Sequence, residues 1–469
     1  MSKRIKLKNI CCIGAGYVGG PTMAVIAKEC PNISVNVVDI NKDRIDSWNQ
    51  IESKELPIFE PNLNEIVQKA RGKNLFFSTD IKSKIAEADL IFISVNTPTK
   101  EKGFGAGQAS DMRFVEASAR TVSEYATGHT IVVEKSTLPV RTAEVIKTIL
   151  NESVYRKSNK ANFSILSNPE FLSEGNAIKD LLHPDRVLIG GENEDAIEAL
   201  AMLYKNWVPE EKIIKTNIWS SELSKLAANA FLAQRVSSIN SISEICEATG
   251  AEISQVSRAI GTDTRIGSKF LKSGPGFGGS CFKKDILNLI YLCRYFNLNQ
   301  SANYWEQVIL FNSWHQKRIS KLIVRKLLGN IANKKIAIFG FAFKANTNDT
   351  RESPSIYIVK DLLEEGAIIN IHDYKVSKEQ IDKDLKNLQK NTKFKQSNNW
   401  NFNNDLLENV NDADAIIILT EWEEYKHLNW GNIATLMRKP SWIFDTRGIL
   451  NKTKIKKAGF HIWSLGEPE

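Results

Sequence analysis

The stretch NICCIGAGYVGG, residues 9–20, decides the fold, because a short apolar run leads directly into a glycine-rich turn. Gly14, Gly16 and Gly19 meet the pattern G-x-G-x-x-G, in which the glycines permit a tight turn, close approach of a pyrophosphate and close helix–strand packing. The N-terminus of the helix that follows would offer N–H groups to phosphates. The stretch therefore predicts the first βα turn of a dinucleotide-binding domain.

The next apolar run, SVNVVD, ends in Asp39, which lies 20 residues after Gly19 (39 − 19). An acid at this place hydrogen-bonds a ribose diol and repels a 2′-phosphate, so NAD is favoured over NADP. Arg44 is either a cover for the adenine or an ordinary solvated helix residue.

Two later turns follow predicted strands, and ligands of doubly wound sheets lie at the carboxyl ends of strands. Each turn is open between a cofactor contact and an ordinary βα connection. The candidate cofactor residues in them are Val95, Asn96, Thr97, Pro98, Thr99 and Ser136.

Short runs rich in Val and Ile alternate with helical patterns up to about residue 215, which predicts βαβ units and a parallel sheet. A purely helical pattern follows at 219–250, capped by Ser220 or Ser221 and stopped by Gly250. The βα rhythm resumes near residue 334, whereas the polar segment 383–405 is expected to be loop with weak helix. The predicted fold is α/β, with two Rossmann-like doubly wound domains joined by a central all-α region with a long helix.

The segment GPGFGGSCFKKD, residues 274–285, presents a single thiol after four glycines. A helical pattern begins just after Cys281, and a helix N-terminus together with Lys283 and Lys284 favours a reactive thiolate. Asp285 lies at i+4 from Cys281 and so shares its helix face. The alternative is a buried structural cysteine, which is the usual fate of a free one.

Lys225 and Asn229 are also i, i+4 partners, in a helix otherwise rich in Ala and Leu. They either project into a cleft or lie on a solvated helix edge. An NAD site combined with a reactive thiol predicts oxidation of an alcohol, through a thiohemiacetal and a thioester, to a carboxylate with two NAD⁺.

Composition excludes several other classes. The net charge of +8 over 469 residues is a mild basic bias that suits an anionic small molecule at least as well as nucleic acid. None of the six cysteines forms a C-x-x-C pair and H-E-x-x-H is absent, so no metal is expected. No apolar run approaches the roughly 20 residues that span a bilayer, so we expect no membrane contact and a cytoplasmic location.

Several long motifs, in one order along the chain, resemble the UDP-glucose/GDP-mannose dehydrogenase family nearly end to end. They are GAGYVGG, VNTPT, EKSTLPV, NPEFLSEG, ELSKLAANAFLAQR, GPGFGGSCFKKD, GFAFKANTNDTRES and FDTRG. The resemblance implies oxidation of UDP-glucose to UDP-glucuronate with NAD as cofactor. It also implies an NAD-binding domain at 1–215, a central helical dimerisation and connector region at 216–328, and a UDP-sugar-binding domain at 329–469.

The resemblance also implies roles for single residues. Cys281 would be the nucleophile that forms the thioester, Lys225 and Asp285 would handle protons and water, and Asn229 would steady the sugar or the oxyanion. Thr137 and Glu174 would lie beside the nicotinamide and the catalytic water, and Glu170 lies in the same loop as Glu174. The implied NAD contacts are Asp39, Arg44, Thr99 and Arg351, and the implied substrate contacts are Lys344, Arg447, Phe277 and Gly278. Arg265 would reach the site of a neighbouring subunit. The last role implies a homo-oligomer that is at least a dimer.

Three alternatives stay open at this point. The same chemistry could act on another sugar nucleotide, such as GDP-mannose or a UDP-N-acetyl sugar. A catalytically silent scaffold would have lost Cys281 or Lys225, and both are present. A one-step hydroxyacid dehydrogenase would share the glycine turn and the helical middle but would need no thiol.

Overall fold

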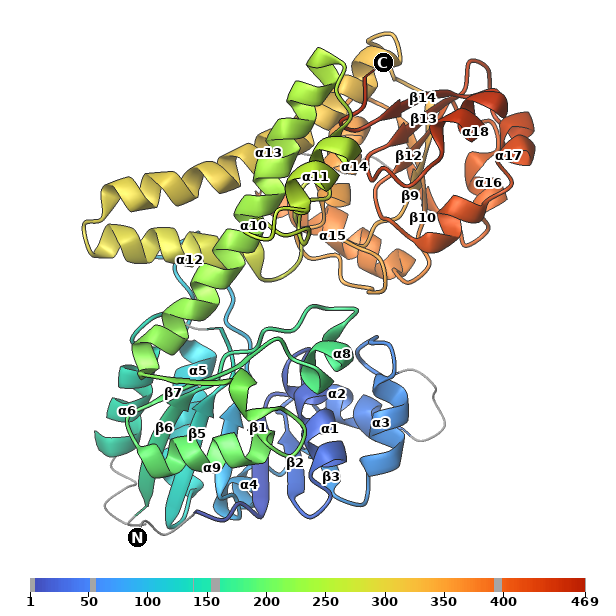
Figure 1. The fold of residues 1–469 in the computed structure, drawn as a ribbon. Helices are drawn as coiled ribbons and strands as arrows, with labels where there is room; N and C mark the ends of the chain where they lie inside the picture. The colour runs from blue at the N-terminus through green and yellow to red at the C-terminus, as the bar shows by residue number, and fades with distance from the viewer. Residues whose placement is uncertain (1–4, 51–55, 138, 153–160, 392–398, 469) are drawn as a thin grey trace. The chain divides into compact units, whose positions relative to one another are not determined.

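The computed structural model describes residues 5–50, 56–137, 139–152, 161–391 and 399–468. The chain divides into two compact units, Met1–Ala228 with Leu287–Leu298 and Asn229–Ile286 with Asn299–Glu469. Each unit contains one sheet of mainly or wholly parallel strands covered by helices (Figure 1). The predicted α/β class with two Rossmann-like domains and a central helical region is confirmed. The division at residues 215 and 328 stays a prediction.

The first unit contains an eight-stranded sheet in the order β3-β2-β1-β4-β5-β6-β7-β8. The first six strands are parallel, β7 runs antiparallel to β6, and β8 is parallel to β7. The strands are β1 (Asn9–Ile13), β2 (Ser34–Val38), β3 (Leu75–Ser78), β4 (Leu90–Ile93), β5 (His129–Glu134), β6 (Asn162–Ser167), β7 (Val187–Gly191) and β8 (Ile213–Thr216).

Helices cover both faces of this sheet, and β1 shows why. Ile10 and Cys12 point into one apolar core, whereas Cys11 and Ile13 point into the other. A strand buried on both faces reads as the continuous apolar run seen in the sequence. The helices are α1 (Gly19–Glu29), α2 (Lys42–Asn49), α3 (Leu63–Ala70), α4 (Ile81–Ala86), α5 (Arg113–Tyr125), α6 (Thr142–Glu152), α8 (Ala177–Leu182) and α9 (Glu194–Tyr204).

The second sheet has six parallel strands in the order β11-β10-β9-β12-β13-β14. The strands are β9 (Lys335–Phe339), β10 (Ile368–His372), β11 (Trp400–Phe402), β12 (Ala415–Ile418), β13 (Trp442–Asp445) and β14 (His461–Ser464). The helices around it are α14 (Pro354–Glu364), α15 (Lys378–Asn391), α16 (Leu406–Val410), α17 (Trp430–Leu436) and α18 (Lys452–Lys457).

Both sheets repeat the same local device at the first two strands. Gly14 and Gly340 have positive φ and follow β1 and β9, and an aspartate follows β2 and β10. Asp39 Oδ2 accepts the N–H of Ala15 at 3.0 Å, and Asp373 Oδ2 accepts the N–H of Phe341 at 2.6 Å. The carboxylate thus holds the glycine turn against the neighbouring strand in each unit.

Four helices lie between the two sheets in sequence: α10 (Ile218–Thr249), α11 (Ile253–Gly261), α12 (Phe282–Tyr295) and α13 (Asn299–Lys326). The long helix predicted at 219–250 is α10, and Gly250 stops it with φ +84° as expected. The predicted cap is wrong, because the helix begins earlier and Asn217 Oδ1 accepts the N–H of Ser220 at 2.8 Å. Asn217 therefore caps the N-terminus of α10, the role that was expected of Ser220 or Ser221.

The expectation for 383–405 is wrong in two places. Helix α15 continues to Asn391, and Trp400–Phe402 forms the edge strand β11. Residues 392–398 of that segment lie outside the described residues. Among the described residues, no helix combines the length and apolarity needed to cross a bilayer.

Candidate active site

The glycine turn of the first unit is built as a phosphate cradle. Gly14 has φ +108°, and a Cβ there would lie 2.4 Å from the carbonyl oxygen of Ser94. A Cβ at Gly19 would lie 2.0 Å from the carbonyl oxygen of Gly14, whereas a Cβ at Gly16 would meet nothing within 4 Å. The turn is therefore packed tightly on the protein side and open at Gly16, where a pyrophosphate would approach. These residues fit a dinucleotide.

Asp39 lies at the end of β2 and is 8% exposed. Its Oδ1 accepts the N–H of Asn41, and its Oδ2 lies 3.2 Å from Nη1 of Arg44. The Arg44 side chain pairs with Asp39 and is 40% exposed, and the choice between an adenine cover and a solvated helix residue stays open.

The two hydroxyl-rich turns after β4 and β5 are bonded to each other. Ser136 Oγ donates to the carbonyl oxygen of Val95 at 2.7 Å, and Thr97 Oγ1 donates to that of Thr137 at 3.0 Å. Thr99 forms a β-bridge with Ser110 that closes the first turn, which also contains Asn96 and Pro98. The structure therefore gathers the predicted cofactor residues of the first unit at one edge of the sheet.

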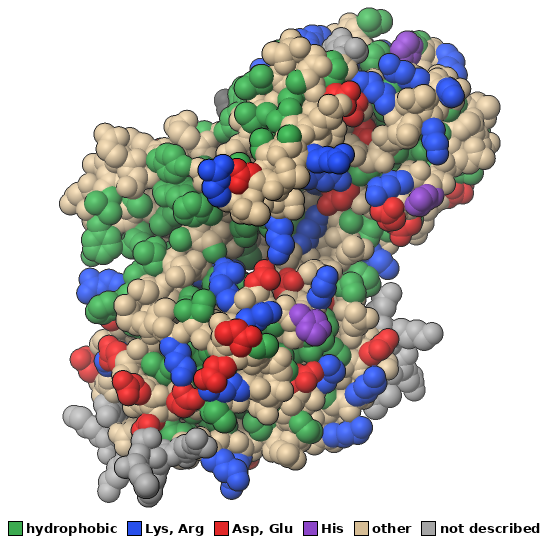
Figure 2. All heavy atoms as spheres, in the orientation of Figure 1, with side chains coloured by type: hydrophobic (Ala, Val, Ile, Leu, Met, Phe, Trp, Pro, Cys, Tyr) green, Lys and Arg blue, Asp and Glu red, His purple; other side chains and the backbone are tan. Residues whose placement is uncertain are grey.

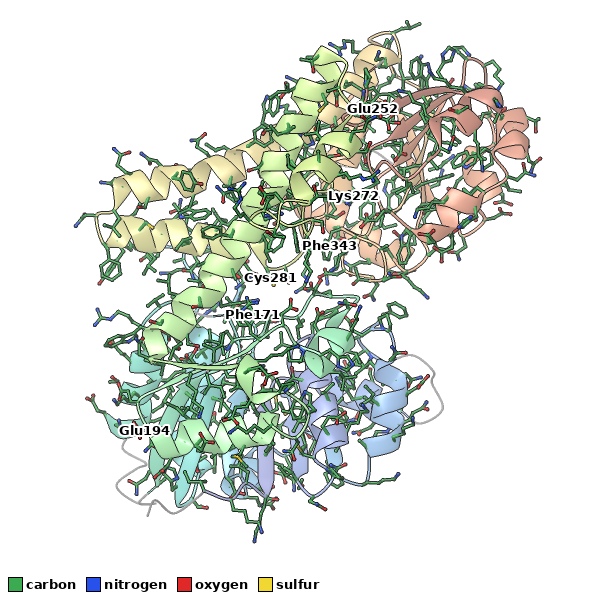
Figure 3. The ribbon with its side chains drawn as sticks, viewed as in Figure 1. Phe171, Glu194, Glu252, Lys272, Cys281 and Phe343 are labelled. Carbon is green, nitrogen blue, oxygen red and sulfur yellow. The ribbon has the colours of Figure 1, made fainter. Side chains whose placement is uncertain are left out.

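A buried ion pair lies in the same unit. Lys225 Nζ is 3.0 Å from Glu170 Oε1, and both side chains are 4% exposed. Glu170 Oε2 accepts the N–H of Leu172 at 2.9 Å, which fixes the carboxylate. Lys225 also lies over the ring of Phe171, a residue of the loop labelled in Figure 3. A buried lysine with a fixed carboxylate partner is suited to moving protons.

Sequence reasoning missed a second buried lysine, Lys135, at the end of β5. Its Nζ donates to Asn168 Oδ1 at 3.0 Å and to the hydroxyl of Tyr204 at 3.2 Å. Burial lowers the pKa of Lys135 to about 8; Glu170 opposes that shift and Lys225 adds to it. The signal was present in the motif EKSTLP, where a lysine directly follows an apolar strand that is buried from its second residue onward.

Glu174 is half-buried in the loop after β6. Sequence reasoning also missed Glu60, whose carboxylate accepts the N–H groups of Gly175 and Ala177 at 2.6 and 3.1 Å. Glu60 therefore fixes the chain directly after Glu174 at the start of α8.

In the second unit, Cys281 immediately precedes α12, as predicted, and its carbonyl oxygen accepts the N–H of Asp285 at 2.8 Å. It is partly exposed, and the other five cysteines are buried (Figure 3). Lys283 and Lys284, expected to favour its thiolate, pair with Glu352 and Asp285, each at 2.8 Å. Ser280 Oγ lies 3.3 Å from the sulfur of Cys281. Helix position and partial exposure distinguish this thiol from the other cysteines.

Asp285 and Asn229 are in contact, as the prediction of a shared site requires. Asn229 Nδ2 donates to Asp285 Oδ2 at 2.6 Å, and both side chains are buried. The two residues come from α10 and α12, so this bond ties the long helix to the helix that follows the thiol.

Arg447 lies against the glycine loop that precedes Cys281. Its Nε donates to the carbonyl oxygen of Leu419 and its Nη2 to that of Phe343, both at 2.7 Å. A Cβ at Gly274 would lie 3.4 Å from Arg447 Nη1. The structure thus brings together the loop and one predicted substrate contact.

Other predicted substrate and cofactor residues surround the same loop. A Cβ at Gly278 would lie 2.6 Å from the carbonyl oxygen of Glu352, Phe277 is buried, and Gly279 donates to the carbonyl oxygen of Arg351 at 2.8 Å. Lys344 lies beside the ring of Phe343.

Two predicted arginines are engaged locally. Arg351 is fixed by Asp349, and Arg265 is 87% exposed and pairs with Asp263 at 2.6 Å. The exposure of Arg265 is compatible with a role toward another subunit. No group of three metal-ligating side chains is found in the parts of the chain that the structure describes.

Sequence comparisons fit these two half-sites. Three profiles of one family match in order: the NAD binding domain at 8–208, the central domain at 219–314 and the UDP binding domain at 337–452. UDP-glucose 6-dehydrogenase of Gallus gallus is 54% identical over 468 residues, covering 98% of this chain and 94% of that protein. The chain belongs to the UDP-glucose/GDP-mannose dehydrogenase family. UDP-glucose 6-dehydrogenase 4 of Arabidopsis thaliana is 53% identical over 477 residues, with 98% and 97% covered.

Solved structures of this family share the fold. A UDP-glucose dehydrogenase from Pyrobaculum islandicum superposes with a TM-score of 0.83 at 27% identity, covering 100% of both chains. A UDP-D-ManNAc dehydrogenase from Pyrococcus horikoshii has a TM-score of 0.79 at 24% identity, with 98% and 99% covered, and shows the fold alone. The family resemblance predicted from the motifs is confirmed, and so is NAD as the cofactor. The chain is an NAD-dependent dehydrogenase.

Proposed function

We propose that the chain oxidises UDP-glucose to UDP-glucuronate in two NAD⁺-dependent steps through a thioester on Cys281. The carrying observation is the thiol itself, partly exposed at the N-terminus of α12 and preceded by a glycine loop that packs against Arg447. Relatives that are 53–54% identical over nearly the whole chain are named UDP-glucose 6-dehydrogenases, which supports this substrate.

The proposed steps use groups that the chain holds in place. Lys225 passes one of its protons to its partner Glu170 and takes the hydroxyl proton in its place as the primary alcohol becomes an aldehyde. The Cys281 thiolate adds to the aldehyde carbon and forms a thiohemiacetal, whose oxidation leaves a thioester. Water positioned by Asp285 cleaves the C–S bond, releasing the acid and regenerating the thiol. Bound NAD⁺ supplies the hydride acceptor for each oxidation, so each substrate yields two NADH.

The UDP group is bound by the second unit in this proposal. Arg447 and Lys344 provide positive charge, and arginine can bind phosphate with two hydrogen bonds. Asn229 would steady the sugar, and the loop that contains Phe277 and Gly278 would surround the sugar nucleotide. On the cofactor side Thr137, Glu174 and Arg351 would lie near the nicotinamide half or its water.

We also propose that the chain works in the cytoplasm as a homo-oligomer, at least a dimer, joined through α10 and α13. Both helices carry exposed aromatic and aliphatic side chains, and Figure 2 shows hydrophobic side chains gathered over the helical region. Contiguous exposed apolar surface of this kind marks interfaces. The main members are Phe231, Ile245, Tyr304, Leu310 and Trp314, which are 46–59% exposed. Arg265 would then serve the site of the neighbouring subunit.

The reaction is tested by counting NADH formed per sugar nucleotide consumed, with UDP-glucose, GDP-mannose and UDP-N-acetyl sugars compared. We expect two NADH per UDP-glucose and a mass increase on the Cys281 peptide in quenched samples. The variant Cys281→Ser should lose steady-state formation of the acid. One NADH per substrate, or turnover on another sugar nucleotide with none on UDP-glucose, would contradict the proposal.

A further inference from the structure

Gly274 and Phe277 lie in the loop before Cys281. The backbone N–H and C=O groups of each residue are hydrogen-bonded by buried side chains. The N–H of Gly274 donates to Asn240 Oδ1 at 2.9 Å, and its carbonyl oxygen lies 3.0 Å from His315 Nε2. The N–H of Phe277 donates to Asn312 Oδ1 at 2.9 Å, and Asn312 Nδ2 donates back to its carbonyl oxygen at 3.2 Å. Four side-chain hydrogen bonds thus hold the backbone N–H and C=O groups of two residues that are three positions apart.

These side chains occupy positions where an apolar residue would ordinarily stand. His315 is 0% exposed and Asn240 1%, and on α13 Asn312 and His315 lie on the same face as the buried Val308 and Ile319. A polar group buried in such a stripe is costly unless it is hydrogen-bonded. All the bonds found for the Asn312 amide go to Phe277, so the loop is what this side chain serves.

His315 retains one unsatisfied atom. Its bond to a carbonyl oxygen requires a proton on Nε2, and among the described residues its Nδ1 has no partner. Burial lowers the pKa of His315 to about 4, so the ring is neutral near pH 7. A leucine at this position would leave no buried nitrogen without a partner. The bond to Gly274 therefore gives the chemical reason for a histidine here.

The glycine between the two bound peptides completes the arrangement. Gly276 has φ +123°, and a Cβ there would lie 2.8 Å from Asn312 Oδ1 and 3.2 Å from Gln316 Nε2. Glycine is therefore what lets Asn312 reach both polar groups of Phe277.

We infer that Asn240, Asn312 and His315 form a clamp that holds the backbone of residues 274–279 in its binding conformation. The clamp thereby also fixes the thiol that follows. These are positioning residues, because they act through the loop. A loop with four glycines loses much conformational entropy when ordered, so a clamp formed beforehand removes that cost from substrate binding. The inference rests on the proposed function, since it assigns the loop to the sugar nucleotide.

The test compares His315→Leu, His315→Gln and Asn312→Leu with wild type, with Ser320→Ala as control. Ser320 is buried on the same helix but donates only to the carbonyl oxygen of Gln316. Four quantities are measured: kcat and KM for UDP-glucose, NAD affinity, the thermal midpoint, and the pH dependence of Cys281 alkylation by iodoacetamide, followed by mass spectrometry of its peptide.

We expect His315→Leu and Asn312→Leu to lower kcat/KM by about 10- to 100-fold, because small misplacements near the chemistry cost this much. The alkylation profile of Cys281 should shift, while NAD affinity stays within about twofold. His315→Gln, whose amide can donate to Gly274, should recover most of the loss. Ser320→Ala should match wild type in all four measurements.

The clamp is wrong if both leucine variants keep wild-type kcat/KM and alkylation profile, or if His315→Gln is no better than His315→Leu. If Asn312→Leu does not fold, the His315→Gln and His315→Leu pair still decides. If His315→Leu does not fold, Asn312→Leu compared with wild type decides, and a wild-type kcat/KM and alkylation profile would refute the clamp. Alkylation needs no substrate, so it tests the clamp even if wild type fails to oxidise UDP-glucose. That failure would contradict the proposed function alone.

Discussion

Lys225 Nζ lies 3.0 Å from Glu170 Oε1, and neither side chain reaches bulk solvent. The pair joins α10 to the loop after β6. A buried ion pair is costly to break from one side, because the remaining charge is left without a partner. Removal of either partner is therefore expected to lower the stability of the fold.

Lys225→Met should lower kcat by about 10²- to 10⁴-fold, the range typical for loss of a positioned proton-transfer group. NAD affinity should be unchanged, because the glycine turn and Asp39 are untouched. The measurements are steady-state NADH formation and fluorescence titration with NADH. Glu170→Gln, which keeps the shape of the side chain, serves as the comparison and should destabilise the fold as well. Activity of Lys225→Met within about threefold of wild type would remove the lysine from the mechanism.

Asp285→Asn should slow release of the acid more than formation of the thioester. The carboxylate is held by Asn229 one helical turn from Cys281, where it can orient a water. We expect acylated Cys281 to accumulate, with a burst of NADH before a slow steady state. Intact mass spectrometry after rapid acid quench measures the acylated fraction. Absence of both the burst and the adduct, with slow turnover, would place Asp285 before the thioester.

Lys135→Met should stabilise the protein near neutral pH. The pKa of Lys135 falls from 10.5 to about 8 on folding, so the unfolded chain binds more protons between these values. Wild-type stability therefore rises with pH across this window, and the cost of the buried charge is fully present below pH 8. The shift corresponds to about 3 kcal/mol at most. Urea unfolding at pH 7 and pH 10 should show the variant's advantage shrinking.

Lys42→Met is a matched control for that comparison, because Lys42 is 77% exposed on α2. It should show no comparable advantage at either pH. An advantage of Lys135→Met that is the same at pH 7 and pH 10 would mean that packing, rather than charge, causes it.

Glu134→Gln should stabilise the chain at pH 8 more than at pH 5. Glu134 is buried beside Glu222, and burial first, then that neighbour, raises its pKa well above the ordinary value. Glu222 accepts the N–H groups of Arg141 and Ala143, whereas among the described residues neither carboxyl oxygen of Glu134 has a hydrogen-bond partner, so the proton is expected on Glu134. A raised folded pKa means that stability is lost as pH rises, and a glutamine side chain stays neutral at every pH.

Glu222→Gln provides the contrast, since an amide cannot replace both acceptor oxygens at the start of α6. It should destabilise the chain at both pH values. The raised pKa of Glu134 would be refuted by a Glu134→Gln effect of equal size at pH 5 and pH 8, measured by chemical denaturation.

Patterns with a single local cause were predictable from the sequence. The apolar run of β1 followed by Gly14 specifies the turn, and the positive φ of Gly250 ends α10, because each depends on neighbouring residues alone. The edge strand β11 could not be predicted in this way. Trp400–Phe402 is three residues long in a polar segment, and it is a strand because β10 offers it partners.

Buried polar residues of the site were the hardest to predict. The sequence places Asn312 and His315 in an amphipathic helix, but only the folded loop supplies the carbonyl and N–H groups that explain them. The partner of Lys283 was hard to predict for a similar reason. Its nearness to Cys281 in sequence suggested that its charge favours the thiolate, whereas its Nζ donates to Glu352, which is 69 positions away in sequence.

The two aspartates that follow β2 and β10, Asp39 and Asp373, differ in the hydrogen bonds that they accept. The carboxylate of Asp373 accepts hydrogen bonds from the backbone N–H groups of Phe341, Ala342, Lys375 and Val376 and from the indole N–H of Trp422. The carboxylate of Asp39 accepts fewer backbone N–H groups and also accepts a hydrogen bond from the Arg44 side chain beside the glycine turn. The same turn, used twice in one chain, thus differs in how many backbone N–H groups its aspartate accepts. Asp373→Ala is expected to destabilise the second unit more than Asp39→Ala destabilises the first, because it leaves more buried N–H groups without an acceptor.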